Sequence, residues 1–115
     1  MFNFERLEVW QKAVAFAGLV YRLSQKFPSD ERFGLSNQIR HAATSIASNI
    51  AEGSALPPTD FAKFIGYASG SLYEVLTQAT LARNEGFLVQ PEFDELYRAA
   101  DEISRMLSGL RKSLE

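Results

Sequence analysis

Apolar residues recur at alternating steps of three and four through the last part of the chain without a break. They are Phe93, Leu96, Ala100, Ile103, Leu107, Leu110 and Leu114. This spacing places side chains on one face of an α-helix, whereas the side chains of a strand alternate with a period of two. Pro91 stands where the first turn of such a helix would begin, a position that tolerates proline well. The pattern predicts a helix over residues 91–113 with one continuous apolar face.

Three earlier segments show the same spacing and are separated by strong helix breakers. The breakers are Pro28, then Gly53 with Pro57 and Pro58, then Gly86. The apolar stripes are Leu7, Trp10, Val14, Ala17 and Tyr21; then Ile39, Ala43, Ile46 and Ile50; then Phe61, Ile65, Ala68, Leu72, Val75, Ala79 and Ala82. The spacing predicts helices over residues 5–26, 36–52 and 60–85.

The helix ends and the heptad spacing together predict how the helices assemble. Ser36 is placed to cap the second helix, and Gly53 to end it in a left-handed conformation. A seven-residue period favours shallow left-handed crossings, and short connections make consecutive helices antiparallel. We expect an all-α fold, an antiparallel up-down-up-down left-handed four-helix bundle. A chain of 115 residues fits one such domain over residues 1–115.

The inventory of reactive side chains argues against common enzymatic chemistries. Without cysteine, the chain has no disulfide, thiolate metal site or cysteine nucleophile. The single histidine, His41, cannot supply the two Glu-x-x-His pairs of a di-iron bundle. Neither a Gly-x-Ser-x-Gly elbow nor a Walker loop occurs in the sequence. We therefore expect a protein that is not an enzyme and that binds no cofactor and no metal.

Charge and hydropathy bear on location and partners. The net charge of -2 argues against a general polycation for nucleic acid or anionic lipid. The first residues lack the pattern of a signal peptide, and no uncharged run approaches the ~20 residues that span a bilayer. We expect a cytoplasmic protein with no membrane contact.

A polar stripe lies beside the apolar stripe of the second predicted helix. It consists of Gln38, Ser45, Asn49 and Glu52, and the third helix offers Tyr67, Ser71, Glu74 and Gln78 at helical spacing. Polar groups on neighbouring helices can form a buried hydrogen-bonded seam that sets the register of a bundle. The stripe is interpreted as such a seam, with a ligand site as the alternative.

The first predicted helix carries a second apolar face. It consists of Val9, Phe16, Val20, Leu23 and Phe27, largely outside the first stripe. A soluble monomer seldom exposes large contiguous apolar patches, so a second apolar face on one helix is typical of a subunit interface. We expect these residues to contact another copy of the chain.

Basic residues gather toward the end where the first and third helices finish. They are Lys26, Arg32, Arg40 and Arg83, and cyclic symmetry would repeat them as a basic rim around a ring. Asp30, Glu31, Glu85 and Glu92 lie nearby and dilute this charge. Arg6, Arg111 and Lys112 gather at the other end. Any nucleic-acid binding is therefore expected to be weak, sequence-tolerant and confined to an end of the assembly.

Several motifs resemble one protein family. They are Phe4-x-x-Leu7-x-Val9-Trp10-x-Lys12-Ala13, Phe27-Pro28, Gly34-Leu35-Ser36-x-Gln38-Ile39-Arg40, Ser45-Ile46-x-x-Asn49-Ile50-Ala51-Glu52-Gly53, Phe61-x-x-Phe64, and Ala68-x-Gly70-Ser71 with Glu74. This set covers nearly the whole chain and resembles the 23S rRNA-intervening-sequence proteins. It is similar also to the accessory protein of diversity-generating retroelements, which binds nucleic acid and a reverse transcriptase.

The resemblance implies a left-handed bundle that assembles into a ring-like homopentamer, with no catalytic residues. It also implies structural or interface roles for the matching polar positions, which are Gln38, Arg40, Ser45, Asn49, Glu52, Ser71 and Glu74. The leading hypothesis is a non-enzymatic homo-oligomeric scaffold or nucleic-acid-associated module of the bacterial cytoplasm. The alternative is a module that binds a protein partner or a small ligand and has no nucleic-acid role.

Overall fold

The computed structural model describes all 115 residues and contains helices and turns but no strand. The α-helices are α1 (Glu8–Ser24), α2 (Leu35–Ser54), α3 (Pro58–Asn84) and α4 (Gln90–Ser113). Two short 3-10 helices, η1 (Asn3–Arg6) and η2 (Ser29–Glu31), precede α1 and α2. The prediction of four helices is confirmed, with every boundary correct to within three residues.

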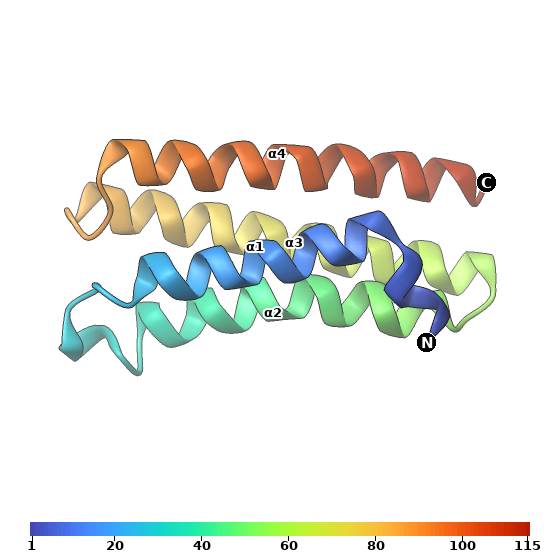
Figure 1. Cartoon of the computed structure of the whole chain (residues 1–115), viewed down its shortest axis with the longest axis horizontal. Helices are drawn as coiled ribbons and strands as arrows, with labels where there is room; N and C mark the ends of the chain where they lie inside the picture. The colour runs from blue at the N-terminus through green and yellow to red at the C-terminus, as the bar shows by residue number, and fades with distance from the viewer.

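The four helices lie side by side along the longest axis of the molecule, and successive connections lie at opposite ends (Figure 1). Each helix contacts two others: α1 contacts α2 and α4, and α3 contacts the same two. The molecule measures 42 × 23 × 22 Å. The 27 residues of α3 would span about 40 Å at 1.5 Å per residue, so this helix runs nearly the full length of the domain.

The apolar stripes of α2, α3 and α4 form most of a single core. Every predicted stripe residue of α2 and α3 is buried, as are those of α4 from Phe93 to Leu107. Leu110 and Leu114 are partly buried and pack against the core near the C-terminus. The stripe predictions for these three helices are confirmed.

The rotation of α1 differs from the predicted one, although Leu7, Trp10 and Ala17 of the predicted core stripe are partly buried and pack against the core. Four of the five predicted interface residues, Val9, Phe16, Val20 and Phe27, are buried in the core, and Leu23 packs against it. In the stripe predicted to face the core, Val14 and Tyr21 are 45% and 46% exposed. Trp10 and Tyr21 carry an N–H and an O–H that favour contact with water, whereas Val9, Phe16 and Val20 carry no polar group. The assignment of these five residues to a subunit interface is therefore corrected.

Two predicted helix ends also differ from the structure. Ser36 lies inside α2, which begins at Leu35, and its side chain caps nothing. Gly53 lies within the last turn of α2, and Gly86, with φ of 82°, is the glycine with positive φ. A Cβ atom at Gly53 would come within 2.6 Å of Phe64 Cβ and 3.0 Å of Phe61 Cδ1. Gly53 is required for the close approach of α3, not for the backbone conformation.

We expect Gly53→Ala to destabilise the protein by about 1–3 kcal/mol, because Phe64 Cβ is tied to the backbone of α3 and cannot move aside alone. The gain in helix propensity, at most about 1 kcal/mol, opposes this cost but does not cancel its upper range. Urea unfolding measures the difference. Gly70→Ala is the matched control, since nothing lies within 4 Å of its Cβ position. A Gly53→Ala protein as stable as Gly70→Ala would contradict the close approach.

No helix of the chain combines the length and the apolar composition that a bilayer crossing requires.

Candidate functional site

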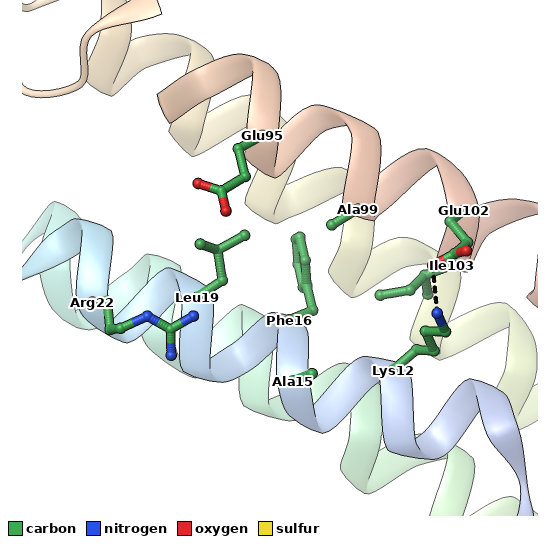
Figure 2. A pocket seen from close by; sticks show the side chains of 9 residues that line it. All are labelled: Lys12, Ala15, Phe16, Leu19, Arg22, Glu95, Ala99, Glu102 and Ile103. Carbon is green, nitrogen blue, oxygen red and sulfur yellow. Dashed lines mark ion pairs between the residues drawn. The ribbon is translucent and has the colours of Figure 1, made fainter. Parts of the chain in front are cut away.

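A pocket of about 210 Å³ lies between α1 and α4. Phe16 and Leu19 point into it from α1, toward Glu95 and Ala99 of α4 (Figure 2). Lys12 Nζ and Glu102 Oε1, 3.2 Å apart, form an ion pair across one end. The lining contains no serine, threonine or histidine, and no cluster of metal ligands. We interpret this pocket as a gap in helix packing, with an exposed ion pair of small energetic effect.

An apolar groove, here called the α1–α2 groove, lies on the outer side of these two helices. Its volume is about 290 Å³. It is lined by Phe4, Trp10, Val14, Ala17, Thr44, Ala47, Ser48 and Ala51. The Phe4 and Trp10 rings pack with centroids 5.0 Å apart, and Phe2 stacks on Phe4 at 5.9 Å. The groove is therefore an aromatic and aliphatic surface whose rings pack against one another and which is open to solvent.

The polar stripe of α2 forms its hydrogen bonds within α2. Asn49 Nδ2 donates to the Ser45 carbonyl at 2.8 Å, and Ser45 Oγ donates to the His41 carbonyl at 2.9 Å. No side-chain hydrogen bond links the stripe to α3, and Gln78 Oε1 on α3 is buried without a partner. Gln38, Glu52 and Glu74 are exposed, and Ser71 is half-buried. The predicted hydrogen-bonded seam between α2 and α3 is thus corrected, because the backbone of α2 already accepts from Ser45 and Asn49, and Gln38 and Glu52 are exposed.

The four residues of the predicted basic rim do not line one common pocket. The turn between α1 and α2 and the turn between α3 and α4 lie at the same end of the molecule (Figure 1). The centroids of the Phe27 and Phe87 rings are 5.9 Å apart there. Lys26 there forms an ion pair with Glu92. The guanidinium carbon of Arg83 lies 4.2 Å from the centroid of the Phe93 ring. Arg32 and Arg40 are the two members that line a common pocket.

The hydrogen bond from Lys26 lowers the pKa of Glu92 below its ordinary value of 4.5. Slight burial opposes this effect, and a hydrogen bond from the Val89 N–H at 3.0 Å supports it. A carboxyl group whose pKa is depressed on folding stabilises the native state above its unfolded pKa, and this contribution is lost as the pH falls through the folded pKa. The pair therefore adds to acid lability below about pH 4.5.

We expect Lys26→Met to raise the pKa of Glu92 toward 4.5, because the charged hydrogen-bond donor is removed. An NMR titration of the Glu92 carboxyl carbon measures the change. Lys12→Met, which removes the cation paired with Glu102, is the control and should leave the Glu92 midpoint in place. An unchanged Glu92 midpoint in Lys26→Met would show that the Val89 N–H alone depresses the pKa.

The pocket that holds the two arginines, here called the turn pocket, lies where the chain passes from α1 to α2. Its volume is about 180 Å³. It is lined by Ser24, Gln25, Phe27, Pro28, Ser29, Arg32, Ser36 and Arg40. Arg40 Nε donates to Ser24 Oγ at 2.7 Å, and Arg40 Nη2 donates to the Tyr21 carbonyl at 3.4 Å. The pocket is polar, and its arginines come from two different segments of the chain.

Arg32 and Arg40 belong to the predicted basic rim, whereas the sequence pattern did not predict Ser24 and Ser36 beside them. Ser36 was assigned to a cap because the start of α2 was placed one residue late; the glycine at position 34 was the available signal for the earlier start. Ser24 lies on α1 and Arg40 on α2, and the turn between these helices brings the two side chains together. No local sequence pattern predicts this hydrogen bond.

Comparison with known proteins agrees with the fold. The profile of a family described as 23S rRNA-intervening sequence protein matches residues 5–109. Among solved structures, the chain is similar to the crystal structure of a protein of unknown function from the S23 ribosomal protein family of Bacteroides thetaiotaomicron. The two are 23% identical, with a TM-score of 0.83 over 90% of this chain and 98% of that chain. No curated protein matches. The family expected from the motifs is confirmed: the chain belongs to the 23S rRNA-intervening sequence proteins.

Proposed function

We propose that the protein is a non-enzymatic scaffold that assembles with further copies of itself through the α1–α2 groove. The observation that carries this proposal is the exposed apolar side of α1, with Val14 and Tyr21 almost half exposed. α1 thus has an uncovered apolar side, which belongs to the stripe predicted to face the core. Contiguous apolar surface of this kind is typical of protein contact sites.

The composition of the groove suits a contact between helical bundles. Aromatic residues supply large contact areas with few rotatable bonds, and Trp and Tyr are enriched at interface centres. Ala47 and Ala51 on α2 leave room for side chains of a partner helix beside Trp10 and Val14. No charged side chain lines the groove, so a second copy can cover it without burying an unpaired charge.

The finer features of the assembly follow from the resemblance and from the heptad spacing. We propose a ring of five subunits, each a left-handed antiparallel bundle, that acts in the cytoplasm. The absence of a catalytic role is supported by His41, an exposed side chain that the chain does not pair with an acid. Nucleic-acid association would use the end of the ring that carries Arg32 and Arg40.

We expect Val14→Glu to convert the oligomer into a folded monomer, because it places an unpaired charge in the contact while leaving the core unchanged. Light scattering coupled to size exclusion measures the mass, and circular dichroism checks the helix content. Leu81→Glu, on the exposed side of α3, is the matched control and should remain oligomeric.

A wild-type protein that is monomeric at micromolar concentration would refute the scaffold proposal. The groove would then be assigned to a different protein or to a small apolar ligand. An oligomer that survives Val14→Glu but dissociates in Leu81→Glu would move the contact to α3.

A further inference from the structure

We propose that the turn pocket binds one phosphate group, held by Arg32, Arg40 and Ser36. This inference concerns a single subunit and holds whether or not the chain assembles. The phosphate could belong to a nucleic-acid backbone or to a small phosphorylated molecule, and the experiment below separates these two sources.

The side chains that line the pocket carry positive charge, and the carboxylate of Glu31 lies at the adjoining start of α2 without lining it. Two guanidinium groups line it, and no carboxylate does. The three ion pairs of the chain involve Lys12, Lys26 and Arg105, so neither Arg32 nor Arg40 has an acidic partner. Arginine presents a planar set of donors that matches the oxygens of a phosphate.

Ser36 supplies a further donor to the pocket. This residue is only 7% exposed, and it lines the turn pocket. Its hydroxyl forms no hydrogen bond within the chain, and its oxygen is open to the pocket, since Gln78 Oε1 is the enclosed side-chain oxygen that lacks a partner. Ser24, which is 2% exposed, differs, because its hydroxyl donates to the Tyr21 carbonyl and accepts from Arg40. The Ser36 hydroxyl is therefore free to donate to a ligand oxygen in this pocket.

The start of α2, where Ser36 lines the pocket, offers free backbone donors. The amides of Ser36 and Asn37 have no backbone acceptor, whereas the Gln38 amide donates to the Gly34 carbonyl at 3.0 Å. Glu31 Oε1 accepts from the Leu35 amide at 3.3 Å and occupies only that donor. Free amides at a helix N-terminus, together with the helix dipole, favour an anion.

Arg40 is held in place before any ligand arrives. Its Nε and Nη2 donate to Ser24 and to the Tyr21 carbonyl, and its guanidinium carbon lies 5.0 Å from the Tyr21 ring centroid. These contacts use two of the five N–H donors that a guanidinium carries, which leaves three for a ligand. A donor that is already positioned loses little conformational entropy on binding.

The size of the pocket limits the ligand to a small group. At about 180 Å³ it is smaller than the roughly 300–1,000 Å³ typical of sites for drug-sized molecules. A single tetrahedral oxyanion fits this description better than a whole nucleotide. The rest of a phosphorylated ligand would therefore lie outside, over the exposed surface of the turn.

The test is a titration of the full-length protein with inorganic phosphate at constant ionic strength, followed by amide NMR. We expect saturable shifts of the Ser36 and Asn37 amide signals. Arg32→Gln removes an exposed guanidinium with no contact inside the chain and should weaken binding about tenfold or more. Ser36→Ala should weaken it less and leave the melting temperature unchanged, since the lost hydroxyl had no partner. Arg98→Gln, which removes an exposed arginine of α4, is the control for net charge.

Two further ligands identify the source of the phosphate. A short single-stranded RNA that displaces inorganic phosphate, with an affinity that falls with salt by a log-log slope of about -0.7 per phosphate contacted, would assign the pocket to a nucleic-acid backbone. Ribose 5-phosphate that binds where the RNA does not would assign it to small phosphate monoesters. Absence of saturable shifts at Ser36 and Asn37, or equal binding by Arg32→Gln and Arg98→Gln, would overturn the proposal.

Discussion

Phe16→Glu is expected to unfold the protein, with loss of the helical circular dichroism signal and of the cooperative melting transition. Phe16 is 1% exposed and packs in the core between α1 and the other helices. Removal of a buried phenylalanine ring alone costs about 3–5 kcal/mol, and the new carboxylate must be desolvated in addition. Because domains of this size are stable by only about 5–15 kcal/mol, the two effects together approach or exceed the whole stability.

Two variants on the same helix make this prediction decisive. Phe16→Leu keeps an apolar side chain at the site and should fold with reduced stability. Val14→Glu places the same charge two residues earlier on the exposed side and should fold normally. A Phe16→Glu protein with native helix content and wild-type melting temperature, but with a smaller mass, would restore the assignment of that face to a subunit interface.

The contrast between α1 and the other helices shows what apolar spacing can predict. In α2 and α4 one face is apolar and the opposite face is largely polar, so only one rotation of the helix buries the apolar side chains. In α3 the seven-residue stripe is buried, and Tyr67, Tyr73 and Leu81 are exposed. In α1 both Val14 and Phe16 belong to apolar faces, and the spacing alone does not predict which of the two faces is buried. In the structure the face with Phe16 is buried. The face with Val14, which also carries the polar atoms of Trp10 and Tyr21, is partly exposed.

Side-chain pairing was predicted less well than helix position. The pair of Asp101 and Arg105, four residues apart on α4, follows from helix geometry, and their side chains meet at 2.7 Å. Asn49 and Ser45 had suitable partners on α3, but the carbonyl groups one turn back in α2 satisfy them first. Contacts between side chains on either side of a turn depend on how the two helices pack against each other. A local sequence pattern does not predict this packing.

Leu107→Ala is expected to lower the free energy of unfolding by about 2–5 kcal/mol, because Leu107 is completely buried in the core. Its position in the α4 stripe predicted this burial, and the neighbouring stripe residue Ile103 is buried as well. The surrounding helices can close the resulting cavity only in part, which explains the range of the expected loss. Urea unfolding followed by circular dichroism measures it through the midpoint, and an unchanged m-value would show that the unfolded state is unaffected.

Leu110→Ala, one turn further along the same stripe, is the matched control. Leu110 is only partly buried, so less apolar surface and a smaller cavity are involved. Its loss should fall clearly below that of Leu107→Ala, since the cost follows the area withdrawn from water and the space left unfilled. If Leu107→Ala cost less than about 0.5 kcal/mol, its side chain would behave as a surface residue, and the burial of the α4 stripe would have to be abandoned.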